Sequence, residues 1–251
     1  MALSVQQSHT ERVMLVGANH VPGHNETPNE IISESWRRCL NQFGLDPAEK
    51  PETEVIELAS LRERRDLLHD FISVARGECR NLYEQISQSG YVIALTDAEG
   101  VILDQRCDPS LENIFHESGL IPGSVWSETR RGTNGMGTAL QIASPVIVHR
   151  DDHFFNTDLA LTCTSSPILD PHGAIAGVLD VSALDIQGSW QSQIHTRALV
   201  QMAANFIEYH YFQKLYQNYT LLRFHPRSEF LGVGAEALMA LDDDGAILAV
   251  N

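Results

Sequence analysis

The chain has 251 residues, 43% of them hydrophobic, so it is long enough to bury a sizeable core in one or two domains. Its 33 Asp and Glu residues outnumber 17 Lys and Arg residues, and the net charge of −16 argues against direct nucleic-acid binding, because phosphate contact needs clustered cations. No apolar run approaches the roughly 20 residues that cross a bilayer, and the N-terminus has no signal-peptide pattern. We therefore expect a cytoplasmic protein without membrane contact.

The four cysteines, Cys39, Cys79, Cys107 and Cys163, form no CxxC pair and lie far apart in the sequence. This spacing favours neither a structural zinc site nor a disulfide scaffold. Four buried, reduced thiols are the simplest interpretation, and we expect no cofactor.

The N-terminal part is predicted to contain a flexible leader over residues 1–26 and a helical segment over residues 27–88. Thr27 and Glu30 have the spacing of a capping box, and Pro28 suits the first helical position, so a helix should begin there and end at Gly44. A second helix is predicted from Thr53 to Ser87. Its heptad pattern consists of Leu61, Leu68, Ala75 and Leu82, with Ile72, Cys79 and Ile86 between them.

Such an apolar seam needs a partner, and a further long helix is predicted from Ser189 to about Leu222. Its broad apolar stripe comprises Trp190, Ile194, Ala198, Met202, Phe206, Tyr209 and Phe212. The long helices can pack within one chain or between the two copies of a homodimer, and heptads alone do not distinguish these alternatives.

Between the long helices the sequence predicts an α+β unit with an antiparallel sheet of about five to six strands. The five runs that indicate strands are Tyr91–Thr96, Val101–Gln105, Val146–His149, Leu159–Ile168 and Ala174–Val181. Hydroxyls and a thiol interrupt the apolar run of residues 159–168, which favours a small, partly polar cavity beside the sheet.

Residues 223–251 repeat the strand–turn–strand pattern of residues 91–105 and stop at Asn251 within an element. We interpret them as the start of a second, truncated domain, because an unpaired hairpin is not stable by itself.

Four motifs together resemble the N-terminal sensor of the acetoin-catabolism regulators, which are bacterial sigma-54-dependent transcriptional activators. The motifs are Ser35-Trp-Arg-Arg-Cys39, Gly132-Thr-Asn-Gly-Met-Gly-Thr-Ala-Leu140, the stretch from Thr162 to Gly173, and Gly177-Val-Leu-Asp-Val-Ser182. The resemblance implies a GAF sensor domain over residues 89–222, including a C-terminal signalling helix. It implies a PAS-like domain that begins within residues 223–251.

The resemblance also implies a small-molecule effector such as a diol, ketone or alcohol. An AAA+ ATPase and a DNA-binding domain would lie outside this chain, and only they would contact sigma-54 RNA polymerase and enhancer DNA. No GxxxxGK[ST] phosphate-binding loop occurs here, so this chain is not expected to hydrolyse ATP.

The candidate ligand-binding residues surround the glycine-rich turn and the polar strands. They are Trp126, Glu128, Asn134, Met136, Thr138, His149, Phe154, Phe155, Thr162, Cys163, Thr164 and Asp180. Structural roles compete with ligand contact: Trp126 in the core, Glu128 as a cap of the following turn, and Asn134 as a support of the turn. Strand periodicity allows either Cys163 or the two threonines to face the cavity, but not all three. Asp180 needs a partner if it is buried.

Two alternatives come from other functional classes, although we expect no enzyme. Some GAF folds reduce free methionine sulfoxide, and Cys163 would then be the nucleophile with His149 or His153 as its base. A metal or gas sensor would draw ligands from His149, Asp151, Asp152, His153 and Cys163, although their spacing matches no standard metal motif.

Overall fold

The computed structural model describes residues 2–18, 28–86, 90–184, 190–234 and 236–251, with the side chains of residues 2–7 and 191 excepted. Its centre is a five-stranded antiparallel sheet with the strand order β2-β1-β5-β4-β3. The strands are β1 (Tyr91–Asp97), β2 (Ile102–Arg106), β3 (Val146–His149), β4 (Leu161–Leu169) and β5 (Ile175–Leu184). The predicted α+β class and the antiparallel sheet are confirmed.

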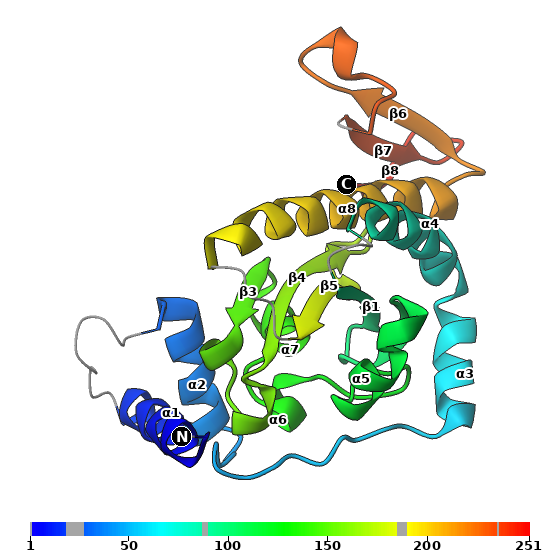
Figure 1. The fold of residues 1–251 in the computed structure, drawn as a ribbon. Helices are drawn as coiled ribbons and strands as arrows, with labels where there is room; N and C mark the ends of the chain where they lie inside the picture. Colours follow the sequence, from blue (N-terminus) through cyan, green and yellow to red (C-terminus); the bar gives the residue numbers. More distant parts are fainter. Residues whose placement is uncertain (1, 19–27, 87–89, 185–189, 235) are drawn as a thin grey trace.

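The sheet is covered on both faces, which explains why its central strands are buried along almost their whole length. Helices α4 (His69–Ile86) and α8 (Trp190–Leu215) lie across one face (Figure 1). On the other face lie α2 (Glu30–Asn41), α6 (Glu128–Arg131) and α7 (Gly135–Ile142), with α5 (Glu112–Glu117) nearby. We call these the α8 face and the α7 face of the sheet.

Strand register assigns each polar residue to one face. Cys163 pairs with Ser182 and Ser165 with Asp180, so these four side chains share a face. Thr164 pairs with Val181, which belongs to the apolar cluster between the sheet and α8.

The heptad seam packs within the chain. Its residues join one buried cluster with strand residues and with Val200, Ala203, Ala204 and Ile207 of α8. The intramolecular alternative is therefore confirmed for this seam. Part of the predicted α8 stripe is left uncovered, because Trp190, Ile194 and Met202 are 45%, 47% and 56% exposed.

The single helix predicted from Thr53 to Ser87 is wrong at its start and centre. Residues 53–57 are extended, because Glu54 and Ile56 form backbone hydrogen bonds with Val125 and Gly123. Helix α3 (Leu58–Leu67) then ends at Leu68, with φ −100° and ψ 22°. The bend lets α3 reach β2, where Arg65 Nε donates to the Leu103 carbonyl. Ser87 lies outside the described residues.

Three further boundaries differ from the predictions. Residues 2–17 form helix α1 (Ala2–Gly17) and not a flexible leader, because Val13 and Val16 are buried in the core cluster that contains α2. Helix α2 is capped by Asn29, whose side chain accepts from the Ile32 amide, while Thr27 lies outside the described residues. Helix α8 ends at Leu215 and not near Leu222, because residues 220–224 pair as a strand; Ser189 is not described.

The C-terminal residues form a three-stranded sheet, consistent in secondary structure with the predicted strand–turn–strand pattern. Its strands are β6 (Thr220–Phe224), β7 (Ala237–Leu241) and β8 (Ile247–Val250). Buried Glu236 joins this sheet to α8, because it accepts from Tyr209 at 2.5 Å and from the amides of Gly232 and Gly234. Burial by itself would raise the pKa of Glu236, but these hydrogen bonds lower it to about 2.

No helix in the described part of the chain combines the length and the apolar character that a membrane span requires.

Candidate functional site

The glycine-rich turn is built around Asn134, which caps α7. Its Oδ1 accepts from the Gly137 amide at 2.8 Å, and its Nδ2 donates to the carbonyls of Gly132 and Trp126 at 2.8 and 3.0 Å. One side chain thus satisfies groups on both sides of the turn and sets the direction in which α7 leaves it.

The two glycines at the start of α7 allow close contact with the sheet. A Cβ atom on Gly135 would overlap Ser165 Oγ and lie 2.6 Å from Cys163 Cβ. A Cβ atom on Gly137 would lie 2.5 Å from the Trp126 carbonyl oxygen. The N-terminus of α7 therefore rests directly on the polar residues of β4 and β5.

Asp180 is the centre of a buried polar cluster on the α7 face. Its carboxylate is inaccessible to solvent and accepts from Ser165 Oγ at 2.5 Å and from Ser182 Oγ at 2.6 Å. Burial raises the pKa of Asp180 to about 6, although the two hydroxyl hydrogen bonds lower it. Both donors are neutral, so this carboxylate is stabilised much less than one paired with a cation.

Cys163 contacts His153 beside this cluster. His153 Nε2 lies 3.3 Å from Cys163 Sγ, and His153 Nδ1 lies 3.0 Å from the carbonyl oxygen of Arg150. A carbonyl only accepts, so the proton belongs on Nδ1, and Nε2 is free to accept from the thiol. Burial lowers the pKa of His153 to about 4 and raises the pKa of Cys163 well above its usual value. The pair is neutral at pH 7.

Thr162 and Thr164 lie on the other face of the sheet, towards α8. Strand periodicity left two alternatives open, and Cys163 is the one that lies on the α7 face. Thr162 Oγ1 is 2.9 Å from His149 Nδ1. Thr164 Oγ1 is buried and has no hydrogen-bond partner among the described residues, and the same holds for Thr138 Oγ1 on α7. His149 is thereby kept away from Cys163 by the sheet itself.

The segment from His149 to Asp158 covers the α7 face. It contains Phe154 and Phe155, which are buried and meet edge to face at 5.0 Å between ring centroids. Phe154 packs over Gly132, where a Cβ atom would lie 2.7 Å from the Phe154 Cβ. We call residues 149–158 the covering segment.

A buried ion pair holds the C-terminal end of the covering segment in place. Arg131 donates to the Asp158 carboxylate through Nε and Nη2 at 3.1 and 2.8 Å. The Arg131 guanidinium also lies 4.8 Å from the centroid of Trp126, whose Nε1 donates to the Gly119 carbonyl at 3.1 Å. Trp126 and Arg131 thus anchor the covering segment to the turn.

Glu128 joins the turn to α2. Its fully buried carboxylate accepts from Arg38 through Nε and Nη2 at 3.0 and 2.9 Å and from Ser35 Oγ at 2.5 Å. Thr133 Oγ1 lies 2.6 Å from Ser35 Oγ. The expected role of Glu128 as a cap is wrong, because its carboxylate oxygens accept from side chains of α2. The Ser35–Cys39 motif therefore docks onto the glycine-rich motif.

Sequence reasoning missed Ser35, Arg38, Arg131, Asp158, Ser165 and Ser182. Strand alternation contained the signal for two of them, because Ser165 follows Cys163 by two residues and Ser182 follows Asp180 by two. The ion pairs join residues 90 and 27 positions apart, which no local pattern indicates.

The described residues contain no group of three or more His, Cys, Asp or Glu side chains arranged to hold a metal ion. The metal ligands considered from the sequence lie on different faces of the sheet: His149 contacts Thr162 on the α8 face, and His153 contacts Cys163 on the α7 face. Asp152 instead accepts from the His149 amide at 3.2 Å.

An antiparallel sheet with paired long helices on one face and a glycine-rich turn on the other defines an α+β domain of the GAF type. The fold resembles that of the N-terminal part of DhaR from E. coli, solved in complex with DhaL. The TM-score is 0.63 at 17% identity, over 70% of this chain and 60% of that one.

Residues 31–196 match the family described as the N-terminal domain of MimR, and the chain belongs to this family. It is 38% identical over 221 residues to the acetoin catabolism regulatory protein of Cupriavidus necator, covering 88% of this chain and 33% of that protein. It is 34% identical over 153 residues to the propane 2-monooxygenase operon activator MimR of Mycolicibacterium goodii, covering 60% of this chain and 25% of that protein. The chain thus spans a third or less of these relatives, which are transcriptional regulators.

Removal of the Arg38 side chain should leave the buried Glu128 carboxylate without its cation. We expect Arg38→Ala to lower the free energy of unfolding by about 3 kcal/mol, measured by urea denaturation. Arg80→Ala, at an exposed position of α4, should change it by less than about 0.5 kcal/mol. The double variant Arg38→Ala/Glu128→Gln should recover part of the loss. Equal stability of Arg38→Ala and wild type would contradict the assigned pair.

Asp180 should make stability depend on pH. Because its pKa in the folded protein is raised from 3.8 to about 6, its stabilising contribution is complete below pH 3.8 and is lost as the pH rises through 6. Asn cannot ionise, so Asp180→Asn should gain about 1–3 kcal/mol over wild type between pH 4 and pH 7.5.

Urea denaturation at both pH values measures this gain. Asp66→Asn, at an exposed position of α3, serves as the control and should show no comparable change. A difference between Asp180→Asn and wild type that stays constant from pH 4 to pH 7.5 would refute the assignment.

Proposed function

We propose that this chain is the ligand-sensing regulatory region of a bacterial sigma-54-dependent transcriptional activator. Its effector is a small polar metabolite, such as a diol, ketone or alcohol, bound on the α7 face of the sheet. Control of the AAA+ ATPase, and through it of sigma-54 RNA polymerase at enhancer DNA, lies with domains outside this chain. The names of the relatives, which include regulators of acetoin, propane 2-monooxygenase and glycerol operons, support a small effector.

The buried cluster around Asp180 is the observation that carries this proposal. A carboxylate that accepts only from two serine hydroxyls costs stability, and a packed apolar core would be more stable. Such a group is retained where it recognises a donor, and a ligand hydroxyl or amine fits it. Met136, fully buried on α7, supplies an adaptable apolar wall beside the cluster.

The packing of α7 and Phe154 means that binding has to displace part of the cover. A ligand that binds the opened arrangement more tightly than the closed one shifts the equilibrium between them. Strands β4 and β5 carry cluster residues on one face and α8 contacts on the other. A shift on the α7 face therefore has a direct physical route to the signalling helix.

The contact between Cys163 and His153 favours a thiol enzyme as the second candidate function. The distance of 3.3 Å suits proton transfer from the thiol. Burial opposes this candidate, since it keeps the thiol protonated and the imidazole neutral, whereas a nucleophilic cysteine needs a lowered pKa. We therefore rank this reading below ligand sensing.

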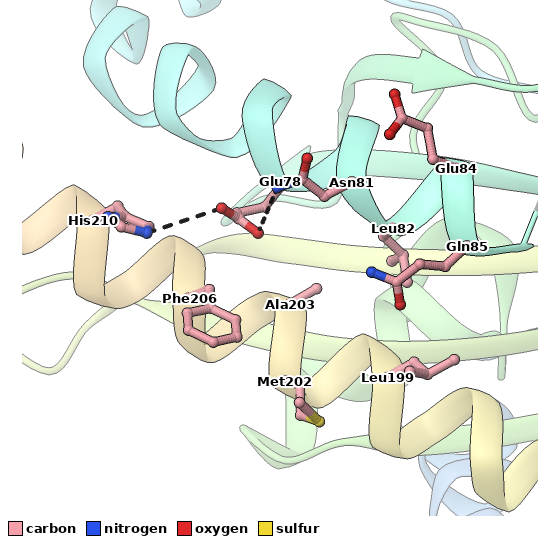
Figure 2. A pocket seen from close by; sticks show the side chains of 10 residues that line it. All are labelled: Glu78, Asn81, Leu82, Glu84, Gln85, Leu199, Met202, Ala203, Phe206 and His210. Carbon is pink, nitrogen blue, oxygen red and sulfur yellow. Dashed lines mark hydrogen bonds and ion pairs between the residues drawn. The ribbon is translucent and has the colours of Figure 1, made fainter. Parts of the chain in front are cut away.

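The proposed function includes a homodimer that forms along the long helices. A groove of about 580 Å³ lies between α4 and α8, next to the uncovered stripe of α8 (Figure 2). Its α8 side presents Leu199, Met202 and Phe206, and its α4 rim carries Glu78 and Glu84. The apolar floor and acidic rim fit an amphipathic helix that carries cations.

A second copy of α8 has this chemistry. Its exposed residues include the cations Arg197 and Lys214. The exposed residues of the stripe recur at every fourth position from Trp190 to Met202. In an antiparallel pair with its two-fold axis at Met202, Ala198 of one copy faces Phe206 of the other. Small and large side chains then alternate along a self-complementary contact.

Effector binding is tested with a panel of small diols, ketones, alcohols and amines. We expect at least one compound to raise the melting temperature and to give a calorimetric binding signal, because a ligand that binds only the folded state stabilises it. Ser182→Ala should weaken that response, and Ser73→Ala, on the exposed side of α4, should leave it unchanged. A panel without any thermal shift or heat signal would sink the ligand-sensing proposal.

Self-association is tested by sedimentation at micromolar concentration. Wild type should sediment as a dimer, and Met202→Glu should be monomeric, because the two-fold axis would bring two carboxylates together. Gln201→Glu adds the same charge at an exposed position that does not line the groove, and it should stay dimeric. A monomeric wild type, or equal dissociation of both variants, would exclude this surface as the dimer contact.

A further inference from the structure

Helix α1 lies outside the residues that match the family and contacts the covering segment directly. His9 Nε2 is 3.4 Å from the Phe154 carbonyl oxygen, and Asn156 Nδ2 donates to Thr10 Oγ1 at 2.9 Å. Arg12 Nη1 donates to the Asp151 carboxylate at 2.5 Å. Three residues of the covering segment, Asp151, Phe154 and Asn156, are therefore tied to one short stretch of α1.

The same face of this stretch also packs on α2, because Val13 and Val16 follow His9 by four and seven residues. Val13 and Val16 are buried with Ile32 and Trp36 in one apolar cluster. The Arg12 guanidinium lies 5.3 Å from the Trp36 ring centroid, and His9 meets the same ring edge to face at 5.8 Å. Trp36 Nε1 in turn donates to the Asp152 carbonyl at 2.9 Å. Helix α1, helix α2 and the covering segment thus meet around one indole.

Beneath the covering segment lies the buried polar cluster. The segment supplies His153, which contacts Cys163, and Phe154, which packs on the glycine-rich turn. Cys163 is completely inaccessible to solvent in this arrangement. Displacement of residues 149–158 would uncover the thiol, whereas the sheet separates it from α8.

The attachment of α1 combines favourable and unfavourable terms. Burial of Val13 and Val16 favours docking, because it removes apolar surface from water. The His9 Nδ1 atom is buried without a hydrogen-bond partner among the described residues, which opposes docking. The Asp151 side chain is 64% exposed, so solvent screens its pair with Arg12 and the pair contributes little to docking. Docking is therefore weak enough to be reversed.

From these contacts we infer that α1 is a strap that holds the covering segment closed over Cys163 and Asp180, and that its release opens the α7 face. This regulatory contact goes beyond the proposed function, because it concerns access to the cluster whether or not an effector binds. Helix α1, which lies outside residues 31–196, would then control access to the sensor core.

The strap is tested by the rate at which N-ethylmaleimide modifies each cysteine in the native protein, with the sites separated by peptide mass spectrometry. Val13→Asp puts a carboxylate into the apolar contact with α2 and should raise the rate at Cys163 at least tenfold. Cys79, on the buried side of α4 at the other face of the sheet, is the internal reference and should keep its rate.

Met14→Asp is the matched control, because it adds the same side chain at a neighbouring position that is 52% exposed. It should label like wild type at Cys163. An unchanged Cys163 rate in Val13→Asp overturns the proposal, and so does a parallel rise at Cys163 and Cys79, which would mean that the whole domain loosens.

If circular dichroism shows that Val13→Asp is unfolded, Arg12→Glu decides the question. It places a like charge against Asp151 and leaves the apolar contact intact, so we expect a twofold to fivefold faster reaction at Cys163 alone. No change at Cys163 in a folded Arg12→Glu variant would then overturn the strap.

Discussion

The pair between Arg38 and the fully buried Glu128 is the contact on which the arrangement of the α7 face depends. It places the glycine-rich turn against α2, and Asn134 then sets the direction of α7. The glycines of α7 bring its N-terminus onto Cys163, Ser165 and Asp180. Loss of the cation would leave the buried Glu128 charge unpaired at a cost of about 3 kcal/mol, so this pair strongly favours the observed position of the turn.

The sheet separates two kinds of chemistry by strand alternation alone. Its α7 face carries a thiol, an imidazole contact and a carboxylate, all closed off from solvent. Its α8 face carries apolar residues and the threonines, and it packs against α8, whose Tyr209 donates to Glu236 beside the C-terminal sheet. The proposed ligand site and the proposed signalling helix thus lie on opposite sides of the same two strands, β4 and β5, which is the arrangement that the proposed regulatory function needs.

Helix boundaries show where local patterns were insufficient. The heptad residues from Leu61 to Ile86 were placed in the core correctly, but the break at Leu68 was not predicted, because α3 turns there to reach β2. Residues 2–17 read as a polar leader, since their two buried valines gain a partner only when α1 meets α2. The end of α8 depended on pairing of residues 220–224 with a strand that follows later in the chain.

The sequence by itself determined the five central strands, the glycine-rich turn and the polar character of β4 and β5, because period-two alternation and turn chemistry are local properties. It also singled out two candidate ligand-binding residues, Asp180, which needs a partner if it is buried, and Cys163. Only the tertiary structure decided which partners they have, which face Thr164 takes, and that Glu128 pairs with Arg38. These contacts join residues far apart in the chain, and their energies arise from burial, which no local pattern contains.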